Sequence, residues 1–252
     1  MQVDILYITH DRLDCTRRSL LDLIDKSDYP FRLQIVDNAS TDETKAYLME
    51  AVRRYSGRLR IDLILNPCNV ALSRVTNSFW RNSSADLVGK IDNDIVVEEC
   101  WLSKFVEAHK RLEQLAVIGG CHFPEKLLRS KKIARNLDEH NGIGLIRQPY
   151  IGGNYLAKRP ILMEHGFLPE DIEPRSFRLG GWTGYQERLA EKGFLIGYYY
   201  PIVRFEHLHT AADAYYRKVR NISRKKYMRW EYKDAKRLLF TAWNWHCRPD
   251  FP

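Results

Sequence analysis

The sequence predicts an α/β fold with a mostly parallel central sheet and helices on both faces. Short apolar runs alternate with segments whose apolar residues recur at helical spacing. Strand and helix alternate in this order throughout the first half, which is typical of parallel sheets. In addition, three early strands end in polar, acid-bearing loops, which a parallel sheet places along one edge.

The expected elements follow the chain in order. Helix 42–56 carries the clearest start, because Ser40-Thr41-Asp42-Glu43 matches a capping box in which the Ser40 hydroxyl and Glu43 carboxylate bind free backbone amides. The expected strands are 3–8, 33–36, 61–65, 87–91 and 115–118, and the helices between them are 14–26, 42–56, 70–82 and 98–113.

The second half is less regular. We expect a strand at 151–157, a helix at 182–192 and a strand at 194–203 that ends near Pro201. The stretch from Pro124 to Arg135 is basic, and Asp138 to Gly144 has the composition of a loop, so 120–150 is predicted as a surface loop or a loop that covers a substrate.

Composition places the chain among ordinary globular proteins. Its 252 residues, 44% hydrophobic and 29% charged, are enough for one large domain with a substantial core. The net charge of +8 is uneven, since residues 204–252 hold 12 Lys and Arg against 5 Asp and Glu. We expect one domain over 1–210 and a basic, aromatic helical extension over 211–252, helical from about Ala211 to Trp243.

Cysteine usage and hydropathy bear on the compartment. Five scattered cysteines without a CxxC pair argue against a disulfide framework and a structural zinc site. No apolar stretch approaches the length of a membrane span, and the first residues have the pattern of a strand. These features lead us to expect a cytoplasmic protein.

The acidic tripeptide Asp92-Asn93-Asp94 closes the strand 87–91. Two carboxylates at the end of a strand supply hard oxygen ligands for a divalent cation that also binds phosphate. Neither GxGxxG nor GxxxxGK[ST] occurs, so a bound diphosphate would need such a cation for charge neutralisation. The tripeptide alone is also common in solvated turns, and its neighbours must decide between these interpretations.

Five motifs in order resemble glycosyltransferase family 2 on a GT-A fold, over about residues 3–210. They are Ile8 to Arg12, Ile35 to Asp42, Asn69 to Ser73 continuing to Asn77, Asp92 to Asp94, and the GGN strand from Ile151 to Ala157. The resemblance implies transfer of a sugar from a nucleoside diphosphate sugar, with UDP as the commonest nucleotide, and inversion at the anomeric carbon.

The resemblance also implies roles for individual residues. Those expected at the nucleotide are Thr9, Arg12, Asp37, Asn38, Asp92 and Asn93, and those expected at the donor or acceptor sugar are Gly152, Gly153, Asn154 and Trp182. Mn²⁺ or Mg²⁺ would be held by Asp94 and Asp92, with His207 completing the shell; an imidazole ligand favours Mn²⁺. The alternative for His207 and His209 is a pair of surface histidines near a turn.

The catalytic base is where the chain departs from the family. Family members usually carry a Glu-Asp pair about seven residues before an Arg, but seven residues before Arg188 stands Gly181, followed by Trp182. Glu187 is the nearest carboxylate, and Asp171 and Glu173 compete with it from the preceding loop. Trp182 would either stack on a sugar ring or pack in the core.

Three other functions remain open at this point. The missing base favours a non-catalytic sugar-nucleotide or glycan-binding protein, and a nucleotidyltransferase would share the sheet but should carry a Gly-rich phosphate loop. The basic aromatic tail would either contact an anionic membrane surface, where a lipid-linked acceptor would lie, or pack its aromatics on the core. The acceptor itself, whether glycan, lipid-linked or protein, is not specified, and no nucleic-acid motif accompanies the tail.

Overall fold

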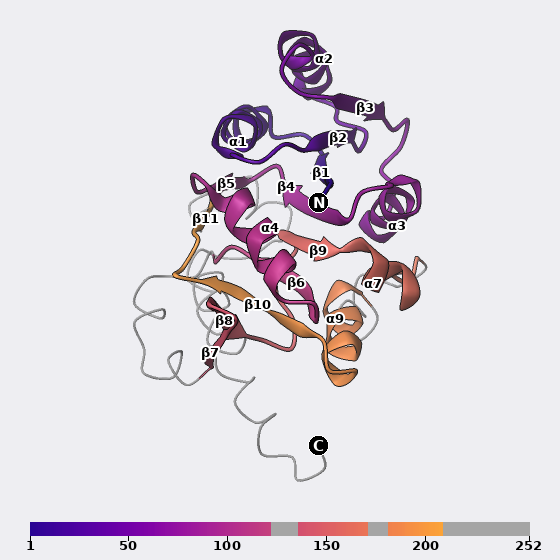
Figure 1. Ribbon diagram of the computed structural model, residues 1–252. Coiled ribbons are helices and arrows are strands. Elements are labelled where there is room, and N and C mark those ends of the chain that lie inside the picture. Colours follow the sequence, from indigo (N-terminus) through magenta and orange to yellow (C-terminus); the bar gives the residue numbers. More distant parts are fainter. Residues whose placement is uncertain (122–135, 171–180, 209–252) are drawn as a thin grey trace, which may run out of the picture.

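A nine-stranded sheet forms the centre of the computed structural model, which describes residues 1–121, 136–170 and 181–208 (Figure 1). The strand order is β3-β2-β1-β4-β9-β6-β10-β8-β7, and every strand except β9 and β8 runs in the same direction. The mostly parallel sheet predicted from the alternation of strands and helices is therefore confirmed.

The first half matches the expected order of elements. It comprises β1 (Val3–Thr9), α1 (Leu13–Lys26), β2 (Arg32–Asp37), α2 (Thr44–Tyr55), β3 (Ile61–Leu65), α3 (Leu72–Asn82), β4 (Leu87–Asp92), β5 (Ile95–Val97), α4 (Trp101–Arg111) and β6 (Leu115–Gly119). Short β5 was not expected; it pairs with β11 (Phe205–His207) in a separate two-stranded antiparallel sheet.

The second half contains β7 (Leu137–His140), β8 (Ile143–Arg147), β9 (Tyr155–Lys158), α7 (Arg159–Glu164), α9 (Trp182–Glu191) and β10 (Leu195–Tyr200). The loop expected between Asp138 and Gly144 is wrong, since β7 and β8 form a hairpin whose turn places Asn141 and Gly142 at positive φ. The strand expected from Ile151 begins only at Tyr155, and helix α7 was not expected.

Helices cover both faces of the sheet. Alternate side chains of β1 point to opposite faces, so Ile5 and Tyr7 enter one core while Leu6 and Ile8 enter the other. The first core is closed by α1, α2 and α4, and the second by α3, α7 and α9. In β4, Leu87 and Ile91 belong to the first core and Val88 to the second, which fixes the direction of every side chain that this strand presents.

The capping box expected at Ser40 is wrong. Helix α2 begins at Thr44, and the Ser40 hydroxyl instead donates to the Asp37 carboxylate and accepts from the backbone amide of Asp11. Asp42 takes over the capping role, because its Oδ1 accepts from the Thr44 amide at 2.9 Å and its Oδ2 from the Leu13 amide at 3.2 Å. One carboxylate thus caps the starts of both α1 and α2.

Several expectations fall on residues that the structure does not describe. These are the basic stretch from Pro124 to Arg135, the candidate bases Asp171 and Glu173, His209, and the tail from 211. The helical extension and its contact with a membrane surface therefore stay predictions. Within the described part of the chain, no helix is long and apolar enough to cross a membrane.

Candidate active site

The polar loops predicted to share one edge of the sheet do so. Asp37 closes β2 and is paired with Thr9 at the end of β1, while Asp92 closes β4 and is paired with Ile8. Because β9 is antiparallel to β4, its first residue Tyr155 pairs with Lys90, and the preceding Gly152 to Asn154 lies beside Asp92. The candidate residues of four of the five motifs therefore gather at the carboxyl edge of the parallel strands.

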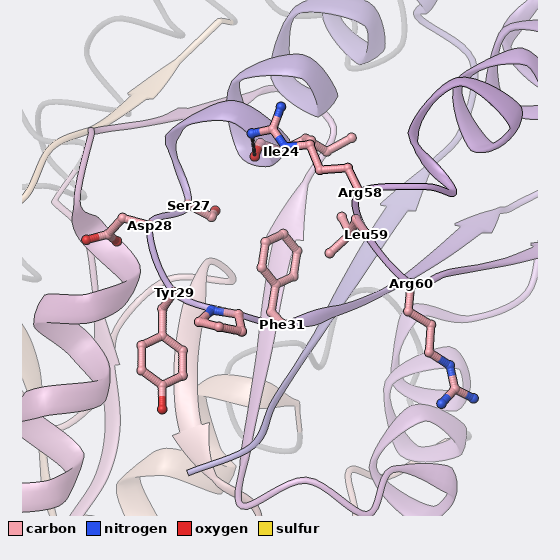
Figure 2. A pocket seen from close by; sticks show the side chains of 9 residues that line it. Ile24, Ser27, Asp28, Tyr29, Phe31, Arg58, Leu59 and Arg60 are labelled. Atoms are coloured by element: carbon pink, nitrogen blue, oxygen red, sulfur yellow. Dashed lines mark hydrogen bonds between the residues drawn. The ribbon is translucent and has the colours of Figure 1, made fainter.

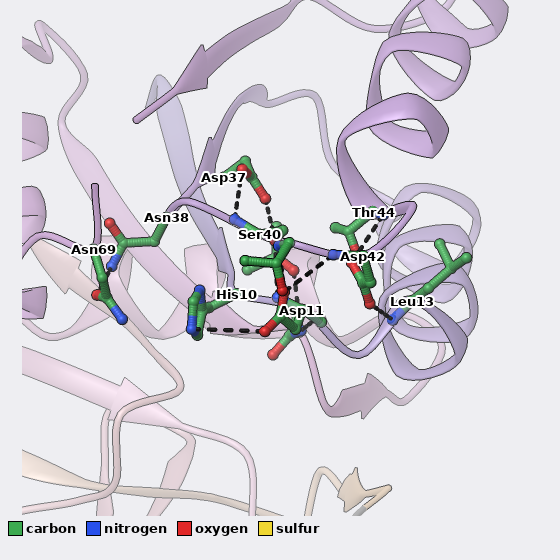
Figure 3. Close-up of polar contacts among 12 residues, drawn as sticks. His10, Asp11, Leu13, Asp37, Asn38, Ser40, Asp42, Thr44 and Asn69 are labelled. Carbon is green, nitrogen blue, oxygen red and sulfur yellow. Dashed lines mark hydrogen bonds and ion pairs between the residues drawn. The ribbon is translucent and has the colours of Figure 1, made fainter. Parts of the chain in front are cut away.

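Hydrogen bonds to the Asp11 and Asp37 carboxylates fix the loops that follow β1 and β2 (Figure 3). The Asp11 carboxylate accepts from the backbone amide of Thr41 at 2.6 Å, and the Asp37 carboxylate accepts from the amide and the hydroxyl of Ser40. Asp37 is fully buried. Its carboxylate therefore organises this loop from inside, and the contact with a base or ribose expected of it stays a prediction.

Backbone strain concentrates in the same loops. Asp11, Arg12 and Ala39 have φ of 55°, 68° and 65°, a left-handed conformation that is uncommon for residues with a Cβ. Such strain persists only where surrounding contacts enforce it, and it is found disproportionately at functional sites. Arg12 is also the residue that precedes α1, so its conformation turns the chain from the strand end into the helix.

Three of the expected nucleotide residues are buried and already bonded within the protein. The Thr9 hydroxyl bonds that of Thr16 at 3.0 Å, and the Asn93 amide donates to both hydroxyls. Asn38 uses its amide nitrogen and oxygen on Asn66, Asn69 and Val70. These side chains hold the loops together, so the nucleotide contacts expected of them stay predictions that their hydrogen bonding does not favour.

Asp94 forms the charged centre of the edge. Its Oδ2 lies 3.3 Å from both terminal nitrogens of Arg12 and 3.7 Å from Nε2 of His207, and its backbone oxygen accepts from the Leu208 amide at 2.7 Å. The pairing of β11 with β5 delivers His207 to this place, opposite Ile95. The structure thus brings together three residues that the sequence placed about eighty and more than one hundred positions apart.

Asp94 and His207 fit a divalent cation as a two-residue donor set. A carboxylate and an imidazole within 3.7 Å of each other suit Mn²⁺, which would take its other ligands from water and from phosphate oxygens. No cluster of three or more His, Cys, Asp or Glu side chains forms a metal site within residues 1–121, 136–170 and 181–208.

Asp92 lies in a different set of contacts, on the Gly153 side. Its Oδ1 is ion-paired with the ammonium of Lys90, and its Oδ2 accepts from the side-chain amide of Asn154 at 3.2 Å. Asn154 also accepts from the Asp92 amide at 2.7 Å. Sequence reasoning missed Lys90, although a lysine inside an otherwise apolar strand, two residues before Asp92 and hence on the same face, was a readable signal.

The start of α9 braces the segment Gly152 to Asn154. Nε1 of Trp182 donates to the Gly152 oxygen at 3.0 Å, and fully buried Gln186 bonds both the amide and the oxygen of Ile151 at 3.0 Å. The Trp182 ring stacks on Tyr155, with centroids 4.2 Å apart. Core packing, one of the two roles considered for Trp182, is therefore observed.

Glu187 does not share the face of α9 that meets this segment. Trp182 and Gln186 lie one helical turn apart on that face, and each further residue rotates by about 100°. Glu187 is therefore turned about 100° away from Gln186. The helix carries no carboxylate at Gly181 or Trp182, where the family pattern has its acids.

A groove of about 420 Å³ lies elsewhere. Its lining comes from the residues that precede β2 and β3, among them Tyr29, Phe31, Arg58 and Arg60 (Figure 2). These segments are at the amino ends of parallel strands, opposite the edge that carries Asp94. The groove is thus separate from the candidate site.

Comparison with known proteins decides the family. Residues 4–168 match the family described as Glycosyl transferase family 2, which is well over half of the chain. This chain belongs to glycosyltransferase family 2. The match spans the strand ends that carry Arg12, Asp37, Asp92 and Asp94, and it confirms the resemblance read from the motifs.

Solved structures agree on the GT-A fold. One is a mannosyltransferase, PcManGT from Pyrobaculum calidifontis, in complex with GDP-Man and Mn²⁺, with a TM-score of 0.65, 16% identity and coverage of 87% of this chain and 60% of that one. Another is S. aureus TarS 1-349, with a TM-score of 0.56, 14% identity and coverage of 88% and 64%.

A third similar structure is GalNAc-T7 with UDP, GalNAc and Mn²⁺, with a TM-score of 0.60, 14% identity and coverage of 82% of this chain and 43% of that one. This family 2 chain spans less than two thirds of each of these proteins. No curated protein sequence matches it. At such low identity the structural similarity shows the fold, which is the GT-A fold expected from the sequence.

Proposed function

We propose that this family 2 chain is a metal-dependent glycosyltransferase that moves a sugar from a nucleoside diphosphate sugar to an acceptor hydroxyl. The observation that carries the proposal is the convergence of Arg12, Asp94 and His207 at the carboxyl edge of the sheet, with Asp94 3.3 Å from Arg12 and 3.7 Å from His207. Acid, imidazole and guanidinium together suit a cation bound to a diphosphate.

Each residue has a chemical task in this proposal. Asp94 and His207 hold the cation, whose positive charge stabilises the departing nucleoside diphosphate. The Arg12 guanidinium, which lies against Asp94, binds diphosphate oxygens with charge-assisted hydrogen bonds. Asp37 and the loop it organises support the nucleoside, and Gly152 to Asn154 lines the sugar side next to Asp92.

The reaction we propose is direct displacement with inversion. The acceptor oxygen bonds to the anomeric carbon as the bond to the diphosphate oxygen breaks, and the acceptor proton passes to a carboxylate. Glu187, Asp171 and Glu173 remain the candidate bases. Replacing Glu187 by Gln tests whether Glu187 is the base. Loss of a general base lowers kcat by about 10²-fold to 10⁴-fold, whereas loss of a surface glutamate leaves kcat unchanged.

A non-catalytic sugar-nucleotide-binding protein is the second candidate, because the start of α9 has Gly181 and Trp182 in place of acids. Both candidates predict metal-dependent nucleotide binding, and only the enzyme predicts turnover. A Mn²⁺-dependent hydrolysis or transfer assay distinguishes them.

Metal-dependent nucleotide binding, which both candidate functions predict, is tested by a thermal-shift panel of UDP-, GDP- and dTDP-sugars, each with and without Mn²⁺. We expect one nucleotide class, with UDP as the first choice, to raise the melting temperature only when Mn²⁺ is present. If no nucleotide raises it in the presence of the metal, the proposed function is wrong.

A further inference from the structure

Lys90 is a buried cation in the middle of the fourth strand. Its side chain is only 9% exposed. Strand alternation places Lys90 on the same face of β4 as Val88 and Asp92, towards α3, α7 and α9. A lysine is retained in such a place only when its charge is paired and hydrogen-bonded.

The partners of Lys90 are on the sugar side of the site. Its ammonium is ion-paired with Asp92 and lies 3.3 Å from the Gly153 oxygen. Gly153 also lies close to both charged groups, because a Cβ on Gly153 would stand 3.3 Å from the Asp92 carboxylate and 3.4 Å from the Lys90 ammonium. Together with the two bonds between Asp92 and Asn154, this fixes the Asp92 carboxylate against the segment that precedes β9.

Asp94 has an entirely different environment. Its carboxylate faces Arg12, which precedes α1, and His207 of β11. Asp92 does not join Asp94 and His207 in any three-residue metal-binding cluster among the residues described. The two acids of Asp92-Asn93-Asp94 are therefore divided between two charge pairs.

We infer that Lys90 is a positioning residue that assigns the two acids to separate tasks. Its charge neutralises Asp92 and fastens it to Gly153 and Asn154 on the sugar side, so that Asp94 with His207 is left as the protein's contribution to the metal shell. This inference rests on the proposed function, and it replaces the expectation that Asp92 shares the metal.

The experiment measures Mn²⁺ affinity by titration, following the electron paramagnetic resonance signal of the free ion, in the full chain with UDP or GDP present. Asp94→Asn is the reference for loss of a ligand. Lys90→Met removes one positive charge beside the site, so we expect Mn²⁺ to bind about threefold or more tightly. A purely structural role for Lys90 would not tighten binding, and Lys90→Arg should keep the wild-type affinity.

The double variant Lys90→Met/Asp92→Asn is decisive, because it removes both charges and leaves no unpaired ion that would threaten folding. We expect its Mn²⁺ dissociation constant to stay within about threefold of wild type, while Asp94→Asn weakens binding at least tenfold. If the double variant loses affinity as Asp94→Asn does, Asp92 is a metal ligand and this inference alone is wrong. If Asp94→Asn binds Mn²⁺ normally, the metal site of the proposed function is wrong as well.

Discussion

The guanidinium of Arg12 lies 3.3 Å from the Asp94 carboxylate through both of its terminal nitrogens. The two residues come from the ends of different strands, and Arg12 adopts φ of 68° at its place before α1. This pair places one positive and one negative charge at the carboxyl edge of the sheet, where we propose that a metal-bound diphosphate binds.

Replacement of Arg12 by Gln should weaken binding of a nucleoside diphosphate. The loss of a charge-assisted hydrogen bond costs about 1.5–3 kcal/mol, which corresponds to a dissociation constant at least tenfold higher. Isothermal titration with UDP and GDP in Mn²⁺ measures it. The matched control is Arg18→Gln, which removes an exposed ion pair between Arg18 of α1 and Glu206 of β11 and should leave affinity unchanged. Equal affinities for wild type and Arg12→Gln would contradict the assignment.

Asp42 should contribute to stability through two helices. Its carboxylate accepts from the amides of Leu13 and Thr44, so Asp42→Ala removes the caps of α1 and α2 and should cost about 2 kcal/mol. Urea unfolding at pH 7 gives the value. Asp25→Ala, which breaks an exposed pair with Arg58, serves as the control and should cost less than about 1 kcal/mol. A similar small loss for both variants would show that Asp42 caps neither helix.

The pH dependence of the Asp42 contribution has a definite sign. Partial burial opposes ionisation, but the bonds from Thr44 and Leu13 outweigh it and lower the pKa of Asp42. A lowered folded pKa means that the stabilisation is present near neutrality and is lost as the pH falls through the acid range. The gap between wild type and Asp42→Ala should therefore narrow as the buffer is acidified.

His109 should make the fold sensitive to acid. Burial lowers the pKa of His109 to about 3, while its ring bonds the Leu156 oxygen at 3.2 Å. Below pH 6.5 the unfolded chain gains a proton that the folded chain does not, so this residue reduces stability by about 1.4 kcal/mol for each pH unit down to about 3. Unfolding titrations between pH 7 and pH 5 should show a shallower loss of stability for His109→Gln.

An identical slope in wild type and His109→Gln would mean that His109 takes up its proton in the folded state.

Gln186 should be needed to hold the segment from Gly152 to Asn154 in place. Gln186→Leu leaves the amide and oxygen of Ile151 buried without their partner, at a cost of about 2–4 kcal/mol. Thermal or urea unfolding measures the loss, and Glu191→Gln on the exposed end of α9 is the control. If Gln186→Leu unfolds like wild type, the bracing of Gly152 to Asn154 by α9 has another source.

Much of the fold was predictable because hydrophobic periodicity reports burial directly. The runs 3–8 and 87–91 are strands, and the helix expected over 182–192 is α9. The hairpin β7–β8 was missed because the residues of β7 are mostly polar and only partly buried, so Asp138 to Gly144 has the composition of a loop. The capping box failed because the Ser40 hydroxyl is bound by Asp37, a tertiary contact that a local motif does not contain.

The candidate site was predictable where its polar residues come directly after the carboxyl ends of strands. Arg12, Asp94 and His207 were chosen separately and the structure brings them together. The division between Asp92 and Asp94 was not predictable from the tripeptide, because it depends on Lys90, earlier in the same strand, and on Asn154 from the segment before β9. A matching motif does not by itself give the hydrogen-bond partners of a side chain. The positions of Thr9, Asn38 and Asn93 match the family pattern, while their polar atoms are hydrogen-bonded inside the protein.

Asp94→Asn is the sharpest probe of the proposed metal site. Isothermal titration should be carried out on wild type and variant, in Mn²⁺, with the nucleoside diphosphate sugar that gives the largest thermal shift. We expect binding by wild type that requires Mn²⁺, and at least tenfold weaker binding by Asp94→Asn with an unchanged melting temperature of the unliganded protein. Metal-dependent binding of equal strength in Asp94→Asn would contradict the role of Asp94 as a metal ligand.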